Sequence, residues 1–234
     1  MIVVVGSRHD ESAREIVARW ASHDAALLTC EDLSAAGWQH RLFSPSTSKA
    51  VVSGQVIAES DIRGVLVRRP WIFEQELVHI AAPDREYVSA EMNAFLVSWL
   101  SHLPCRVLNR PAGTCLCGPN WRPQQWVQAA VLAGMKVDPM RWRVPFAKKR
   151  APATVDSRAE PSIKVTVVGD QCVGATDDSC VASALRLAAI AGTELLEIQL
   201  ATVKEAMCFR EANPIPNLKN VEVAKAVCEF LLSN

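Results

Sequence analysis

The sequence lacks an excess of charge of either sign. Its 25 lysine and arginine residues balance 25 aspartate and glutamate residues, so the formal net charge is zero. Proteins that bind nucleic acid usually present a basic face. The balance therefore argues against a nucleic-acid partner.

Long apolar runs are missing as well. No stretch reaches the roughly 20 consecutive apolar residues that a membrane-spanning helix needs, so we expect no membrane partner. The N-terminal residues Met-Ile-Val-Val-Val-Gly lack the charged region and the long apolar region of a secretory signal peptide. We therefore expect a cytoplasmic protein.

The spacing of cysteine and histidine residues does not match a zinc site. The eight cysteines are scattered, and only Cys115 and Cys117 lie close together in the sequence. A single Cys-x-Cys pair without a second pair or a nearby histidine is a poor zinc signal, and the five histidines also lack metal-ligand spacing. The cysteines are therefore interpreted as reduced and mostly buried thiols.

The N-terminal segment has neither a Walker motif nor a Gly-x-Gly-x-x-Gly motif. It does have an apolar run at residues 2–5, a helical pattern after Asp10 and a second strand-like run at residues 25–29. This order predicts an α/β fold that begins with a Rossmann-like sheet. The loop Gly6-Ser7-Arg8 is either an anion-binding loop at a helix N-terminus or a plain strand-to-helix turn.

Two arginines follow the apolar strand predicted at residues 64–67. Ligands of open α/β sheets gather outside the carboxyl ends of the strands, and Arg68 and Arg69 lie at such an end. One interpretation is a positive rim that binds the carboxylate or phosphate of a cofactor. The other is a solvated strand end with one arginine paired to Glu74 or Asp84.

The rest of the chain alternates between strand and helix patterns. In order, we expect strands near 40–43 and 49–58, a helix over 84–101, a strand over 105–108, a helix over 123–133, a β-hairpin over 163–175, a helix capped near Asp177 that ends at Gly192, and a closing helix over 220–232. Residues 147–162 are polar, contain proline and lack apolar periodicity, which indicates a linker or loop.

A candidate magnesium site lies near the C-terminus. The strand-like run at residues 207–213 ends at Pro214, and side chains two apart on a strand share a face, so Glu211 and Asn213 project together. Carboxylate and amide oxygens suit Mg²⁺. A polar turn at Lys204 and Glu205 joins this strand to the run at residues 195–201. Alternatively, the two side chains only satisfy backbone donors in a turn before the proline.

The hairpin, the sequence Glu-Ala-Asn-Pro and the closing helix together resemble the C-terminal end of ATP-grasp ligases. The similarity is greatest to ligases that act on peptide carboxylates, such as the microviridin-type macrocycle-forming enzymes. Residues 64–145 resemble these ligases too, because a strand that ends in Asn-x-Pro, a helix, the pattern Ala-x-x-x-Gly and a valine-proline strand follow one another in the same order. This resemblance implies a Rossmann-like pre-ATP-grasp domain at residues 1–112 and an α+β ATP-grasp lobe at residues 113–234.

The resemblance also implies roles for four residues near the C-terminus. Glu211 and Asn213 match metal-ligand positions of the family. Gln199 stands where the family usually has an acidic metal ligand, and Lys164 stands where it places an arginine that contacts phosphate or acyl-phosphate. Lys164 is therefore the candidate catalytic and cofactor-binding residue, and Gln199, Glu211 and Asn213 are candidate metal ligands.

One part of the family pattern is missing. In ATP-grasp enzymes a whole nucleotide-binding subdomain with a glycine-rich loop occupies the region where this chain has the linker at residues 147–162. The resemblance therefore implies a truncated lobe in which binding of ATP and Mg²⁺ is weak or lost.

Three hypotheses for the function follow. The first is an accessory or binding protein without independent ligase activity, which forms a homodimer and binds a peptide or a partner ligase. The second is a minimal ATP- and Mg²⁺-dependent carboxylate–amine ligase, completed by a partner chain or by closure of the loop at residues 147–162. The third is a plain α/β scaffold in which Glu211 and Asn213 only end a strand.

Overall fold

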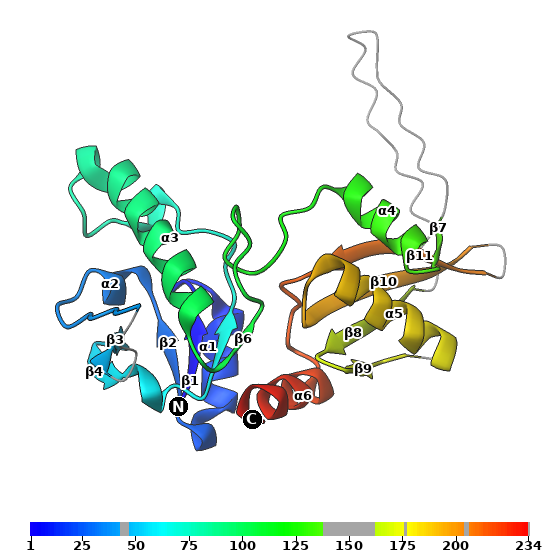
Figure 1. Cartoon of the computed structure of the whole chain (residues 1–234), viewed down its shortest axis with the longest axis horizontal. Helices are drawn as coiled ribbons and strands as arrows, with labels where there is room; N and C mark the ends of the chain where they lie inside the picture. Colours follow the sequence, from blue (N-terminus) through cyan, green and yellow to red (C-terminus); the bar gives the residue numbers. More distant parts are fainter. Residues whose placement is uncertain (43–46, 138–161, 176, 204–205, 234) are drawn as a thin grey trace, which may run out of the picture.

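The computed structural model describes residues 1–42, 47–137, 162–175, 177–203 and 206–233 (Figure 1). Within these ranges the protein is a mixed α/β protein with a parallel sheet in its N-terminal part and a mixed sheet in its C-terminal part.

The first sheet contains four parallel strands in the order β2-β1-β5-β6. Their bounds are β1 Ile2–Val5, β2 Ala25–Leu28, β5 Gly64–Val67 and β6 Arg106–Leu108. Both inner strands, β1 and β5, are buried along their whole length. This is why they read in the sequence as continuous apolar runs and not as an alternating pattern.

Helices cover both faces of this sheet. Helix α3 (Arg85–His102) packs on one face, where Trp99 contacts the core formed by Val3 and Val65. Helices α1 (Glu11–Arg19) and α6 (Val221–Leu232) share the other face with Ile2 and Leu66. The C-terminal helix therefore packs on the N-terminal sheet, as Figure 1 also shows.

The second sheet has five strands in the order β7-β11-β10-β8-β9. The strands are β7 Lys136–Val137, β8 Ser162–Val168, β9 Gln171–Val173, β10 Leu195–Val203 and β11 Ala206–Asn213. Helices α4 (Pro123–Leu132) and α5 (Asp178–Ala191) pack on one face of it. Only β7 runs parallel to its neighbour, so the sheet is mixed.

A two-stranded ribbon and several short helices complete the described part. The ribbon pairs β3 (Lys49–Val52) with β4 (Gln55–Ala58). The short helices are α2 Cys30–Leu33, η1 Ala21–His23, η3 Glu59–Asp61, η4 Glu74–Glu76 and η5 Ala82–Asp84.

Most of the predicted elements are confirmed. Asp10 caps α1 and Asp177 caps α5, because each carboxylate accepts a hydrogen bond from a backbone amide in the first turn. The strand predicted near 40–43 is wrong over residues 40–42, which contain no strand, and residue 43 lies outside the described residues; next to them, Gln39 forms an isolated bridge to Lys49. A single bridge needs no alternating pattern, and that segment has none.

Some predictions fall outside the described residues. The predicted linker at 147–162 lies outside them except for Ser162, which begins β8, and so does the turn at Lys204 and Glu205. The division into domains at residues 112 and 113 stays a prediction. None of the helices in the described ranges combines the length and the apolarity needed to cross a membrane.

Candidate functional site

The second sheet has one apolar face and one polar face. Val165, Ile198 and Phe209 point toward α4 and α5 and are buried in their core. Because side chains alternate along a strand, the residues between them project from the opposite face. That face carries the residues predicted from the C-terminal motif.

The strand register brings these residues together. Gln199 on β10 pairs with Lys164 on β8 and with Glu211 on β11. Two residues earlier on β10, Glu197 pairs with Asn213. Together these five side chains line a hollow of about 230 Å³.

A β-bulge adjusts the strand register at this point. Gln199 pairs with Glu211, whereas the next residue, Leu200, pairs with Phe209, so Arg210 is the extra residue on β11. An extra residue shifts the alternation of side chains by one position and re-aims those that follow it. The bulge therefore lets Leu200 and Phe209 stay in the core while Gln199 and Glu211 both face the hollow.

Glu197 is a member of the site that the sequence prediction missed. It lies two residues before Gln199 on the same strand, so it shares the face of Gln199. The prediction counted one position on this strand as a possible ligand and found an amide. The same alternation would have identified the carboxylate of Glu197, two residues before Gln199.

Lys164 lies inside the hollow and forms an ion pair there. Its Nζ atom is 2.9 Å from Oε1 of Glu197. The lysine side chain is 58% exposed, whereas that of Glu197 is 15% exposed. Such a partly solvated pair adds little to stability, but it places a positive charge next to one of the two carboxylates.

Asn213 uses its amide in a local turn. Its Oδ1 accepts a hydrogen bond from the backbone N–H of Ile215 at 2.9 Å, and its Nδ2 donates to the carbonyl of the same residue at 3.0 Å. This is the turn-forming role that the alternative interpretation assigns to the residue. Oδ1 still has a second lone pair for a further partner.

The donor set of the hollow fits a hard divalent cation in type. Glu197 and Glu211 offer carboxylate oxygens, and Gln199 and Asn213 offer amide oxygens, which are ligands that Mg²⁺ accepts. The ammonium group of Lys164 competes with such a cation for Glu197. The hollow is therefore a candidate cation site that the ammonium group of Lys164 already partly occupies.

Arg68 and Arg69 do not line this hollow. Arg68 is almost buried; its Nη1 donates to the carbonyl of Pro216, and its Nε lies 3.6 Å from Oδ2 of Asp10. Arg69 donates to the carbonyls of Trp71 and Gly6, and it forms an ion pair with Glu76. Both guanidinium groups are thus held by acceptors of the chain itself.

The loop Gly6-Ser7-Arg8 is similarly occupied. Arg8 forms an ion pair with Glu31 at 2.6 Å, and the carbonyl of Gly6 accepts from Arg69 at 3.4 Å. In this structure the loop serves as a strand-to-helix turn in front of α1, whose first amides are capped by Asp10. Whether it also binds an anion stays a prediction.

Asn109 joins the two sheets. It follows β6, is 2% exposed, and forms five hydrogen bonds with backbone groups. Its Oδ1 accepts from the amides of Glu194 and Leu195, and its Nδ2 donates to the carbonyls of Leu195, Pro214 and Cys117. One buried side chain therefore fixes the start of β10 and the residue after Asn213.

The chain is similar to several solved structures over its whole length. One is the macrocyclase MdnC from Microcystis aeruginosa MRC, bound to the precursor peptide MdnA. Its sequence identity with this chain is 13% and the TM-score is 0.67, and the match covers 100% of this chain and 99% of MdnC. Another is the ATP-grasp ligase PsnB, complexed with a minimal precursor, Mg and ADP, with 14% identity and a TM-score of 0.68 over 99% of this chain and 98% of PsnB. The chain has the ATP-grasp fold.

A third solved structure supports the same fold. A RiPP-associated ATP-grasp ligase from Chryseobacterium gregarium, in complex with ADP and a leader and core peptide, shares 10% identity with a TM-score of 0.66, covering 98% of this chain and 96% of the other. The sequence matches no protein-family model and no curated protein. At this level of identity the similarity establishes the fold alone.

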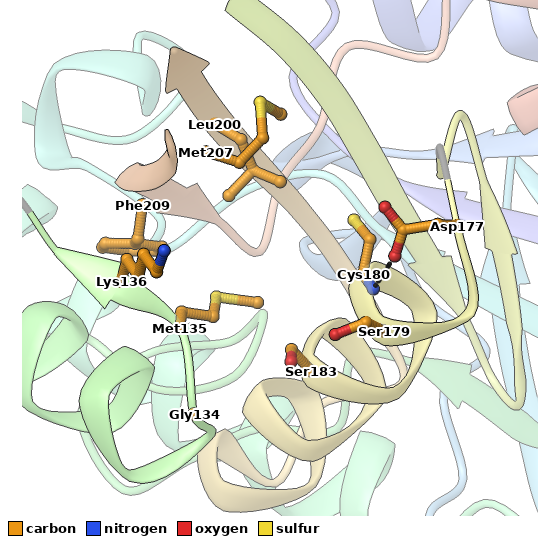
Figure 2. A pocket seen from close by; sticks show the side chains of 10 residues that line it. All are labelled: Gly134, Met135, Lys136, Asp177, Ser179, Cys180, Ser183, Leu200, Met207 and Phe209. Carbon is orange, nitrogen blue, oxygen red and sulfur yellow. Dashed lines mark hydrogen bonds between the residues drawn. The ribbon is translucent and has the colours of Figure 1, made fainter. Parts of the chain in front are cut away.

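A second hollow of this ATP-grasp fold lies at the other end of the β10–β11 hairpin (Figure 2). It has about the same size, 230 Å³, and lies between β7, the hairpin and the first turns of α5. One side is mainly apolar, with Met135, Leu200, Met207 and Phe209 beside Lys136; the other carries polar groups, among them Asp177, Ser179 and Cys180. No pattern in the sequence identified it, because its walls come from four separate segments.

Proposed function

We propose that this protein is a degenerate ATP-grasp-like protein that binds peptides or a partner ligase and has no ligase activity of its own. The ion pair between Lys164 and Glu197 carries the proposal. A working site needs its carboxylates free for metal and its cation free for phosphate. Here Lys164 and Glu197, one of the two carboxylates of the hollow, neutralise each other, and the amide of Asn213 is bound to Ile215.

The sequence from the end of α4 to the end of β8 supports the same proposal. Residues 135–168 contain no glycine. Glycine permits the close approach of backbone amides that a phosphate-covering loop requires. We therefore propose that the Rossmann-like N-terminal domain is followed by a lobe that lacks the glycine-rich loop expected from the resemblance.

A peptide is the proposed partner. The similar solved structures named above hold precursor or leader peptides. In this chain the second hollow offers an apolar wall with two methionines, whose flexible thioether side chains adapt to varied partners. A homodimer is the proposed assembly, and sedimentation velocity of the pure chain tests it by mass.

One observation favours the alternative of a minimal ligase. Glu197 adds a second carboxylate to the hollow, so the site is richer in ligands than the sequence indicated. In that case Glu197, Glu211 and Asn213 would hold Mg²⁺, which would offset phosphate charge. Lys164 would have to leave Glu197 and turn toward the phosphates.

Calorimetry with Mg·ATP separates the two proposals. The accessory role predicts no binding tighter than about 100 µM by the chain alone, and binding only after a full-length ATP-grasp ligase is added. The minimal ligase predicts binding by the chain alone that Glu211→Ala abolishes. Gln199→Asp should raise Mg²⁺ affinity in either case, because it adds a carboxylate opposite Glu211.

Crosslinking tests the partner. A photo-crosslinking amino acid at position 207, which is exposed at the second hollow, should capture a precursor-type peptide or an ATP-grasp ligase in the native host. The same group at the exposed position 221 on α6 is the control. Equal capture at both positions, or of unrelated proteins only, would contradict the proposed contact.

A further inference from the structure

Three metal-ligating side chains meet at the carboxyl edge of the parallel sheet. Cys30 and Glu31 begin the helix that follows β2, and His79 lies in the segment between β5 and α3. One ligand atom from each lies within 4.8 Å of the other two. Ligands of open α/β sheets bind at this edge, and among the described residues this is the only such group of three or more His, Cys, Asp or Glu side chains.

The three side chains are already in contact with one another or with orienting groups. The thiol of Cys30 donates to Oε2 of Glu31 at 3.4 Å. The Nε2 atom of His79 is 2.8 Å from Oγ of Ser34. When one imidazole nitrogen is held in this way, the ring orientation is fixed and the other nitrogen is left for a metal.

The mixture of ligands identifies the class of metal. A thiolate, an imidazole and a carboxylate are the ligands of Zn²⁺ and of related transition metals, whereas Mg²⁺ and Ca²⁺ prefer oxygen alone. We propose that Cys30, Glu31 and His79 bind a divalent transition metal of the zinc class. Three protein ligands leave the fourth tetrahedral position open for water or for an exogenous ligand.

The exposure of Glu31 and His79 gives a metal access to the buried thiol of Cys30. Cys30 is 4% exposed and forms the floor of the group, whereas Glu31 is partly exposed and His79 is exposed at its rim. A metal that binds Cys30 replaces the proton of the thiol, which goes to solvent.

Arg8 is the group that competes with the metal. Its guanidinium forms an ion pair with Oε1 of Glu31 at 2.6 Å, while the thiol of Cys30 contacts the other oxygen, Oε2. Arg8 is 54% exposed and can move into solvent. Removing its charge should therefore strengthen metal binding, whereas removing a ligand should weaken it.

This site is independent of the hollow on the second sheet. That hollow offers only oxygen donors and the ammonium of Lys164, so it selects hard cations. The group at Cys30 contains sulfur and nitrogen, so it selects softer ones. If the group at Cys30 binds no metal, the proposal for the hollow on the second sheet is unaffected, and the converse also holds.

Titration of the full-length, reduced protein with Co²⁺ tests the proposal. Thiolate ligation gives Co²⁺ an intense near-ultraviolet charge-transfer band, and the expected result is one that saturates at a single equivalent and disappears when Zn²⁺ is added. Cys30→Ser should abolish the band, and His79→Ala should weaken binding at least tenfold. Ser34→Ala should weaken it by about tenfold through the orientation of His79, and Arg8→Gln should strengthen it.

Other thiols and histidines of the chain provide the controls. Cys105→Ser, His23→Ala and the double variant Cys115→Ser with Cys117→Ser should each leave the band unchanged. Circular dichroism of every variant confirms that it is folded. The proposal is overturned if the wild type shows no saturable band, or if folded Cys30→Ser keeps it.

Discussion

At the scale of single residues, the most heavily bonded polar side chain of the described chain is Asn109. It bonds to two backbone amides and three carbonyls, and three of these five hydrogen bonds are buried. Unpaired buried backbone groups are expensive. Asn109 therefore determines where β10 starts and where the segment after Asn213 lies.

Replacement of Asn109 should be costly. Asn109→Ala is expected to lower the free energy of unfolding by about 3 kcal/mol, because several buried donors and acceptors lose their partner at once. Urea denaturation measures the change. Asn217→Ala is the matched control: Asn217 is exposed and accepts one local hydrogen bond, from Lys219, so its loss should cost less than about 0.5 kcal/mol.

The buried thiol of Cys30 should make the stability of the protein depend on pH in the alkaline range. Burial and Glu31 raise the pKa of its thiol from an ordinary 9.0 to about 11. The unfolded chain therefore ionises this thiol first, so the contribution of Cys30 to stability is present below pH 9 and is lost as the pH rises toward 11. Urea midpoints between pH 8 and pH 11, with a chelator present, should fall less steeply for Cys30→Ala than for the wild type. Parallel slopes would contradict the assignment.

At the scale of elements, the candidate site shows what alternation in the sequence reveals and what it does not. Glu211 and Asn213 share a face because they are two apart, and the structure places them in one hollow. Glu197 was within reach of the same rule. Its pairing with Lys164 was not, because it depends on the register between β8 and β10, which no local pattern records.

The arginines illustrate a second limit of sequence patterns. Their position at the carboxyl end of β5 was predictable, and one was expected to pair with Glu74 or Asp84. The actual partner of Arg69 is Glu76. The turn at η4 decides which of these nearby carboxylates points inward, and that turn has no apolar periodicity to identify it.

Lys164 should control the cation affinity of the hollow. Lys164→Gln removes a positive charge and frees Glu197, so Mg²⁺ affinity is expected to rise by about fivefold, the effect of roughly 1 kcal/mol between close charges in water. Isothermal calorimetry measures it. Lys225→Gln removes a charge from an exposed pair on α6 and is the control. An equal response of both variants would mean that only the net charge of the protein matters.

The contact between α6 and β5 depends on a glycine. A Cβ atom at Gly64 would lie 2.6 Å from the carbonyl oxygen of Leu231, so Gly64→Ala must push the helix away from the sheet. We expect a loss of about 2 kcal/mol in the free energy of unfolding. Gly113→Ala adds the same methyl group where nothing lies within 4 Å, and it should be nearly neutral in the same thermal or urea unfolding experiment.

At the scale of the whole molecule, the order of elements was largely predictable and their arrangement was not. Caps, apolar periods and turn residues identified the longer helices and most strands in the described ranges, but not α2, β7 or the short helices η1, η3, η4 and η5. Nothing in the sequence of α6 indicates that it packs between the two sheets, against Ile2 and Leu66 of the first and Val168 and Leu195 of the second. Its apolar stripe predicts a buried face but not the surfaces that cover it, and the close approach of Gly64 to Leu231 is visible only in the folded structure.

We propose that an ATP-grasp fold persists here without a working nucleotide site. Release of ADP from Mg·ATP by the pure chain, measured in a coupled assay with and without a carboxylate-bearing peptide, tests it most directly. We expect a rate that does not exceed the background and is the same for the wild type and Glu211→Ala. Turnover above the background that Glu211→Ala abolishes would contradict it.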